Sequence, residues 1–223
     1  MKELVAREIA MRARSGETIG VGSGTTVDLA IDQIGRRVRE EGMQIRVVPS
    51  SYQSARRCEA AGLAVLHPAC CDALHWGFDG ADAVDPQRRL IKGRGGAMLQ
   101  EKILAARCRD YVIIIDESKL VENLGGTCPV PVEVIPEALA VAEKGLLSLG
   151  ASSLKLRQGT ACERTVPMIS QAGNLIIDAH FDNIAETLER DIKAVVGVVE
   201  NGLFIGYASE VLIATSQGIK TLP

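Results

Sequence analysis

Short apolar runs alternate with amphipathic segments along the first 115 residues, and this alternation constrains the fold more than any other feature. Runs that are apolar throughout, such as YVIII at residues 111–115, predict strands that are buried on both faces. The segments between them have helical spacing, which predicts a parallel sheet covered by helices on both sides. The expected strands are residues 18–22, 45–48, 63–66, 74–78 and 111–115, and the expected helices are residues 3–14, 26–40, 51–61 and 97–107.

The pattern changes after residue 115. Two consecutive glycines and the segment PVPVEVIP (residues 129–136) interrupt the alternation, which predicts a domain boundary. The fold class expected is therefore α/β, with a Rossmann-like parallel-sheet domain and a second, smaller α+β domain that contains an antiparallel sheet. The larger domain should comprise residues 1–127 and 203–223, with 203–206 and 211–215 returning to its sheet, and the smaller domain residues 128–202, with strands at 153–157, 175–178 and 195–199 and helices at 137–149 and 184–193.

Charge and cysteine content narrow the possible partners. The chain has 25 Lys and Arg residues against 28 Asp and Glu residues with no basic cluster, so we expect no nucleic-acid partner. Charges interrupt every apolar run before about 18 residues, so no membrane partner is expected. The N-terminus lacks the apolar block of a secretion signal, and six scattered cysteines are typical of reduced thiols. Together these features predict a cytoplasmic protein that binds a small molecule.

The segment GVGSGTT, residues 20–26, lies between an expected strand and an expected helix. It is not the dinucleotide fingerprint, because Thr25 takes the place of the third glycine. Glycines allow a tight turn that gathers backbone N–H groups, and the helix N-terminus adds a partial positive charge. With the hydroxyls of Ser23, Thr25 and Thr26, this arrangement suits a phosphate monoester. The alternative is a tight turn in which Thr25 or Thr26 caps the helix.

Three carboxylates occur within seven residues in DGADAVD, residues 79–85. The segment follows an expected strand, at the edge where open α/β sheets bind their ligands. These carboxylates could act as general acids and bases or bind a divalent cation. A solvated acidic turn is the alternative.

A third motif is IKGRGGAMLQEK, residues 91–102, in which Lys92 precedes a glycine-rich turn that leads into a helix. Helical spacing places Glu101 beside Leu104 and Ala105, and a second apolar side opposite predicts a helix that is buried on two sides. A buried carboxylate is costly unless it is paired, and burial makes it a stronger base. Glu101 is thus either a general base or a carboxylate held by a structural lysine or arginine.

Metal binding is not expected. His67, Cys70, Cys71 and His75 are possible ligands by type. However, adjacent cysteines on an extended chain point to opposite faces, and no second ligand pair occurs at zinc spacing.

In this order, the three motifs resemble those of the A-type ribose-5-phosphate isomerases. The resemblance extends over nearly the whole chain, and its collinear order is more specific than any single motif. The further matching segments are DESKLVENLG (116–125), PVPVEVIP, LRQG (156–159), GNLIID (173–178) and GLFIG (202–206).

The resemblance implies an aldose–ketose isomerase that interconverts ribose 5-phosphate and ribulose 5-phosphate through a cis-enediolate, in the non-oxidative branch of the pentose phosphate pathway. It implies no metal or organic cofactor, a phosphorylated pentose as substrate, and a homodimer or homotetramer. Glu101 would be the general base and Lys92 would stabilise the developing oxyanion, while Asp79, which assists ring opening, and Asp82 complete the catalytic set. The residues implied to bind substrate are Ser23, Gly24, Thr25, Thr26, Asp79, Gly80, Ala81, Asp82, Lys92, Gly93, Arg94, Gly95 and Lys119.

Three positions depart from the family pattern. Arg94 stands where the family usually has glycine, and a positive φ there would cost about 1–2 kcal/mol. Ala83 replaces a glutamate, and SQAGN (residues 170–174) replaces TDNGN. Two other functions therefore stay open, a phosphosugar sensor without catalysis and an isomerase of a different sugar phosphate. The retention of Glu101 and Lys92 favours catalysis.

Overall fold

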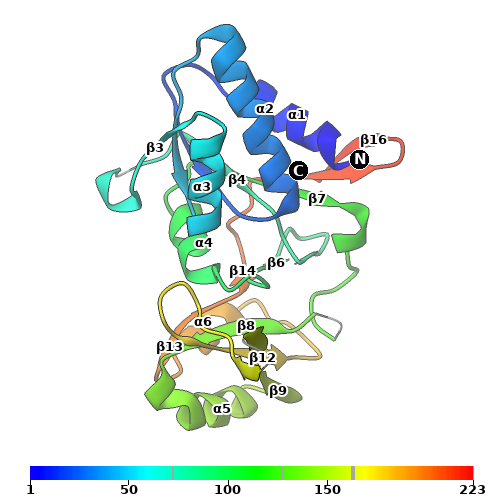
Figure 1. The fold of residues 1–223 in the computed structure, drawn as a ribbon. Coiled ribbons are helices and arrows are strands. Elements are labelled where there is room, and N and C mark those ends of the chain that lie inside the picture. The colour runs from blue at the N-terminus through cyan, green and yellow to red at the C-terminus, as the bar shows by residue number, and fades with distance from the viewer. Residues whose placement is uncertain (72, 127, 162–163, 223) are drawn as a thin grey trace. The chain divides into compact units, whose positions relative to one another are not determined.

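The chain forms two compact units, each assembled from separate stretches of sequence (Figure 1). The computed structural model describes residues 1–71, 73–126, 128–161 and 164–222. The first unit comprises Met1–Ala81, Gln100–Leu120 and Gly206–Pro223, and the second comprises Asp82–Leu99 and Val121–Ile205.

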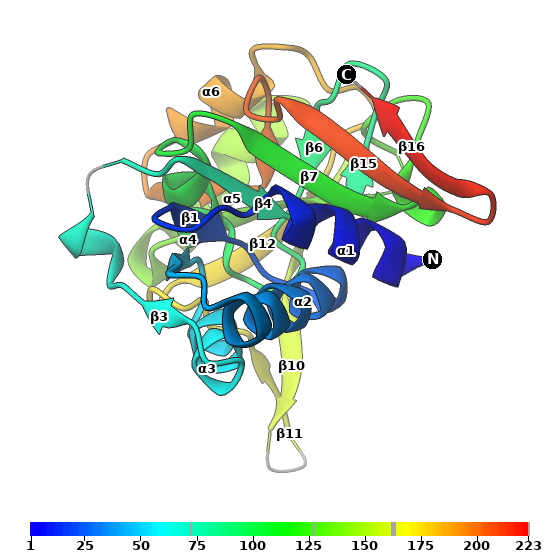
Figure 2. The same cartoon turned by 90° about the horizontal axis from the view of Figure 1, so that it is seen from above.

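A seven-stranded sheet forms the centre of the first unit, in the order β16-β15-β7-β4-β1-β2-β3. All neighbours from β15 to β3 pair in parallel, whereas β16 runs antiparallel to β15 at the edge. Figure 2 shows β7, β15 and β16 side by side. The strands are β1 (Thr18–Val21), β2 (Arg46–Pro49), β3 (Ala64–Val65), β4 (Trp76–Asp79), β7 (Tyr111–Asp116), β15 (Glu210–Thr215) and β16 (Gly218–Leu222).

Helices cover this sheet on both faces, as the alternation predicts. The helices are α1 (Lys2–Arg12), α2 (Thr25–Glu41), α3 (Tyr52–Ala60) and α4 (Met98–Ala105). On one face, α1 and α2 pack against each other and share a buried core with Ile19 and Phe78. On the other face Gly20 leaves room for Leu104 of α4, since a Cβ on Gly20 would lie 3.0 Å from the Leu104 side chain. The predicted α/β fold class is confirmed.

The second unit contains a four-stranded antiparallel sheet, β13-β8-β12-β9, and a three-stranded sheet, β14-β6-β5. A separate hairpin, β10 with β11, completes its strands, and helices α5 and α6 pack beside the larger sheet. The bounds are β5 (Ala83–Val84), β6 (Leu90–Ile91), β8 (Val130–Val134), β9 (Ser153–Leu156), β10 (Gln158–Ala161), β11 (Arg164–Pro167), β12 (Leu175–His180), β13 (Val198–Asn201), β14 (Leu203–Phe204), α5 (Leu139–Ser148) and α6 (Leu188–Lys193).

The segment PVPVEVIP, from which a domain boundary is predicted, follows the division between the units at residues 120/121 and contains β8, an inner strand whose residues are all buried. Pro131 is tolerated because it lacks only an N–H group, and its carbonyl still accepts a hydrogen bond from Gly202 N at 2.7 Å. The expectation that residues 203–206 return to the first sheet is wrong, because Leu203–Phe204 pairs with β6.

The predicted division at residues 127/128 and 202/203 differs from the two units. Residues 82–99, 121–126 and 203–205 lie in the second unit, where β5 and β6 pair with each other and β6 pairs with β14. Thr127, the last residue of the predicted first segment, lies outside the described residues. Within the described residues, no helix is both long enough and apolar enough to span a bilayer.

Candidate functional site

The loop of residues 22–24 connects β1 to α2 and leaves the start of α2 without a side-chain cap. The N-cap residue is Gly24, with φ 114°, and no side chain accepts a hydrogen bond there. The alternative in which Thr25 or Thr26 caps the helix is therefore wrong. Thr25 is exposed and Thr26 is buried. The first N–H groups of α2 thus lie at an uncapped helix N-terminus, which favours an anionic ligand.

Asp79, at the end of β4, fixes the shape of this loop. Its side chain is fully buried. One oxygen, Oδ1, accepts hydrogen bonds from Ser23 N at 3.0 Å and Gly80 N at 2.7 Å, and Oδ2 accepts one from Tyr111 Oη at 2.8 Å. Burial, and then the charge of Asp79, raise the pKa of Tyr111 well above its ordinary value of 10.0, so the phenol keeps its donor proton.

Gly22 is required for this close approach. A Cβ at Gly22 would lie 1.9 Å from Asp79 Cγ, so no other residue fits without a shift of the loop. The absence of a side chain at Gly22 thus allows Asp79 to pack against the loop.

Glu101, in the first turn of α4, is 4% exposed and lies against the same loop. Its Oε1 accepts a hydrogen bond from Ser23 Oγ at 2.6 Å. Ser23 therefore joins Asp79 through its backbone and Glu101 through its hydroxyl. Leu104 is buried beside Glu101 as expected, but the predicted burial of the opposite side is wrong, because Ile103 is 42% exposed.

Lys2, which no sequence motif marks, also reaches the start of α2. Its Nζ lies 3.1 Å from Thr25 Oγ1 and 3.5 Å from Asp116 Oδ2. Asp116 ends β7, and the predicted binding residue Lys119 follows it at the end of a 3₁₀ turn, Glu117–Lys119. A single lysine in an N-terminal helix carries no motif, so only the packing of α1 identifies Lys2.

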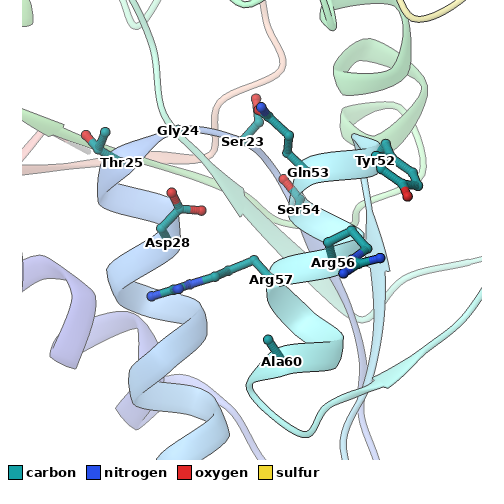
Figure 3. A pocket seen from close by; sticks show the side chains of 10 residues that line it. All are labelled: Ser23, Gly24, Thr25, Asp28, Tyr52, Gln53, Ser54, Arg56, Arg57 and Ala60. Carbon is teal, nitrogen blue, oxygen red and sulfur yellow. The ribbon is translucent and has the colours of Figure 1, made fainter.

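A pocket of about 570 Å³ opens between the start of α2 and helix α3 (Figure 3). Arg57 extends from α3 toward α2 and forms an ion pair with Asp32, while Arg56 lies on the other side of α3. Burial raises the pKa of Asp28 on the facing helix, and Arg57 partly offsets this rise. The pocket is lined by Ser23, Gly24, Thr25, Asp28, Tyr52, Gln53, Ser54, Arg56, Arg57 and Ala60.

The KGRGG turn, residues 92–96, belongs to the second unit. Lys92 is 3% exposed, its N–H donates to Gly202 O at 2.8 Å, and its Nζ lies 5.6 Å from the centre of the Phe204 ring. Arg94 is exposed, and its N–H donates to Asp82 Oδ2 at 3.0 Å. Among the described residues other than glycine, only Arg88 has a positive φ. Arg94 therefore carries none of the strain that a positive φ would cause.

The segment SQAGN, residues 170–174, supplies two hydrogen-bond donors to a buried carboxylate in the second unit. Glu133 is 1% exposed, and its Oε1 accepts hydrogen bonds from Ser170 Oγ at 2.6 Å and Asn174 Nδ2 at 2.8 Å. Ser170 supplies the hydroxyl that threonine has in the family pattern. SQAGN therefore provides donors that a buried carboxylate needs.

In the part of the chain that the structure describes, no three His, Cys, Asp or Glu side chains are grouped as metal ligands.

The predicted site residues fall into one group in each unit. The first unit holds Ser23, Gly24, Thr25, Thr26, Asp79, Gly80, Ala81, Glu101 and Lys119, and the second holds Asp82, Lys92, Gly93, Arg94 and Gly95.

Known proteins are similar to this chain over nearly its whole length. The family model of ribose 5-phosphate isomerase A (phosphoriboisomerase A) matches residues 46–218. The ribose-5-phosphate isomerase A of Synechococcus sp. is 41% identical over 221 residues, which cover 98% of this chain and 94% of that protein. The protein of the same name from Methanothermobacter thermautotrophicus is 40% identical over 225 residues, covering 100% of this chain and 97% of that protein.

Solved structures of ribose 5-phosphate isomerases have folds that match the fold of this chain. The structure of ribose 5-phosphate isomerase A from Methanocaldococcus jannaschii matches with a TM-score of 0.93 at 36% identity, covering 99% of this chain and 96% of that chain. A D-ribose-5-phosphate isomerase in complex with phospho-erythronic acid also gives a TM-score of 0.93, at 35% identity and with the same coverage. The chain therefore belongs to the ribose 5-phosphate isomerase A family.

Proposed function

We propose that this chain interconverts ribose 5-phosphate and ribulose 5-phosphate, and that Glu101 moves the proton between C2 and C1 of the open-chain sugar. The observation that carries the proposal is the hydrogen bond of a 4% exposed carboxylate to Ser23, in the loop that begins α2. Family membership supplies the substrate class. Burial limits the solvation of the Glu101 carboxylate, and the hydrogen bond from Ser23 Oγ holds it in place, as a general base requires.

In the forward reaction, Glu101 takes the proton from C2 of the open-chain aldose. The electron pair of that C–H bond forms the C1–C2 double bond of the cis-enediolate, and the C1 carbonyl oxygen becomes negative. Return of the proton to C1 and transfer of the O2 proton to O1 give the ketose. Atoms and electrons balance within the substrate, so the reaction itself needs no redox partner.

The first unit supplies the phosphate contacts in this proposal. The N–H groups at the start of α2 and the hydroxyls of Thr25 and Thr26 would bind the phosphate oxygens. Lys2 would add positive charge, because its ammonium group lies 3.1 Å from Thr25 Oγ1. Lys119 is proposed to contribute as well, on the basis of the family motif.

Asp79, Asp82 and Lys92 complete the proposed catalytic set. Lys92 would stabilise the negative oxygen of the enediolate, since a fixed cation in a site with little water is effective there. Asp79 is proposed to assist ring opening, and its contacts to Ser23 and Gly80 also hold the loop in shape. A sensor without catalysis would not require a buried carboxylate at Glu101.

The substitution Glu101→Gln tests the proposal. It keeps the shape of the side chain and removes the base, so kcat should fall by at least about 10²-fold while phosphate still competes with substrate. Glu133→Gln is the matched control, because Glu133 is also a buried, hydrogen-bonded carboxylate but belongs to the second unit and to no proposed site. A coupled assay over several pentose and hexose phosphates provides the readout. Near-normal turnover by Glu101→Gln would remove Glu101 from the mechanism, and turnover of another sugar only would change the substrate.

Assembly and compartment are further parts of the proposal. The family resemblance supports a homodimer or homotetramer, and the scattered cysteines support the cytoplasm. Five of the six are free thiols: Cys58, Cys70, Cys71, Cys108 and Cys128. The sixth, Cys162, lies outside the described residues. Light scattering on the purified protein would measure the number of subunits.

A further inference from the structure

Arg157 joins two parts of the second unit through a single guanidinium group. It forms an ion pair with Asp178 of β12, in which Nε lies 3.0 Å from Asp178 Oδ2 and Nη2 contacts Oδ1. Its Nη1 donates to two main-chain oxygens of the KGRGG turn, Gly93 O at 2.8 Å and Arg94 O at 2.9 Å. The side chain is 11% exposed, so this contact is shielded from most of the solvent.

These bonds set the orientation of the peptide groups in the turn. In a trans peptide the C=O and N–H groups point in opposite directions, and the described chain contains no cis peptide. Because the carbonyls of Gly93 and Arg94 face Arg157, the N–H groups of Arg94 and Gly95 face away from it. The Arg94 N–H donates to Asp82 Oδ2 at 3.0 Å, so the turn is held from two sides.

The turn itself has little to fix its shape. Gly93 and Gly96 have positive φ angles of 93° and 80°, and Arg94 contributes an exposed side chain. Glycine-rich backbone is conformationally free unless other groups restrain it. Inside the turn, Gly96 N donates to Gly93 O at 3.0 Å. From outside it, Gly202 O restrains the Lys92 N–H, while Arg157 and Asp82 restrain the peptide groups at Gly93 and Arg94.

We propose that Arg157, held by Asp178, is a positioning residue for the isomerase reaction. It orients the KGRGG turn so that Lys92 and the Gly95 N–H are presented to the oxygens at the reacting end of the sugar. The inference rests on the proposed function, because it assigns that role to this turn. Lysine cannot replace Arg157, since one ammonium group cannot bridge a carboxylate and two carbonyl oxygens with fixed geometry.

The test compares Arg157→Lys with the matched control Arg89→Lys. Arg89 also pairs with a carboxylate, Asp85 at 2.6 Å, and donates to a main-chain oxygen, Ile184 O at 2.8 Å, with 17% of its side chain exposed. We expect Arg157→Lys to lower kcat by at least about tenfold with KM changed less than about threefold, because misplacing a group by about 1 Å can cost about 10²-fold in rate. The control should keep its kcat.

A second readout does not depend on catalysis. Trypsin can cleave the bond between Arg94 and Gly95, and a released turn should be cut faster in Arg157→Lys than in the wild type or the control. Asp178→Asn removes the charge that holds Arg157 without changing side-chain size, and it should reproduce both effects. This variant replaces Arg157→Lys in the test if Arg157→Lys fails to fold. Unchanged kcat, unchanged cleavage, or equal losses in the control would each overturn the role of Arg157. An inactive wild type would refute the proposed function, while the cleavage rates would still test the clamp.

Discussion

Replacing Tyr111 with phenylalanine should lower the free energy of unfolding by about 1.5–3 kcal/mol. The ring of Tyr111 is 1% exposed, and its hydroxyl donates to Asp79 Oδ2 at 2.8 Å. Phenylalanine keeps the ring and removes only this donor. A hydrogen bond to a charged group contributes about 1.5–3 kcal/mol. In a chain of 223 residues, each kcal/mol corresponds to about 2–4 °C, so Tm should fall by about 3–12 °C.

Equilibrium urea unfolding provides the measurement. We expect a lower midpoint with an unchanged m-value, because the substitution alters stability and not the surface exposed on unfolding. The control is Tyr52→Phe, since Tyr52 is 69% exposed and exposed substitutions change stability by about 0.5 kcal/mol or less. If Tyr111→Phe unfolds at the same urea concentration as the wild type, the contact with Asp79 does not stabilise the fold and the reasoning fails.

Three other outcomes are expected. Lys2→Ala should raise KM about three- to tenfold, equivalent to about 0.7–1.4 kcal/mol, and weaken inhibition by inorganic phosphate; an unchanged KM would separate Lys2 from the phosphate. Arg94→Gly should leave kcat/KM within about twofold, because the Arg94 side chain is exposed and its backbone unstrained; a tenfold rise in KM at low salt only would show that Arg94 reaches the substrate. The hydrogen bond from Arg12 lowers the pKa of Glu210 below its ordinary value of 4.5, so this pair stabilises the fold above that pH and the contribution disappears as pH falls through the lowered pKa. The Tm difference between wild type and Glu210→Gln should therefore be complete at neutral pH and shrink in acid, and a constant difference would contradict this.

The parallel sheet could be predicted because its strands are apolar in a way that few other structures allow. All but the last residue of β7 are buried, which requires helices on both faces. Apart from β8, which is buried throughout but contains Pro131, the strands that the sequence did not reveal are too short or too exposed to have such a pattern. β5, β6 and β14 have two residues each, and the described part of β11 is exposed throughout. Pairing with distant segments decides their conformation.

Part of the candidate site could also be predicted from the sequence, because some of its residues are neighbours along the chain. Local spacing indicated the glycine loop before α2 and the carboxylates at the end of β4, because the glycines and the strand–helix order lie within a few residues. The partners of these groups come from elsewhere in the chain. Tyr111 is 32 residues from Asp79, and Lys2 is 23 residues from Thr25. Only the packed sheet brings such residues together, so no sequence motif marks them.

The order of strands in the first unit also has a consequence for synthesis on the ribosome. β7 lies between β4 and β15, but β15 is made only after the whole of residues 121–205. A nascent chain that ends before Glu210 can form the sheet from β3 to β7, but the apolar edge of β7 stays unpaired until β15 has been synthesised. Unpaired apolar edges promote association between chains. The interval before the last strands emerge is thus the period in which this protein is most exposed to aggregation, and β15 with β16 ends it.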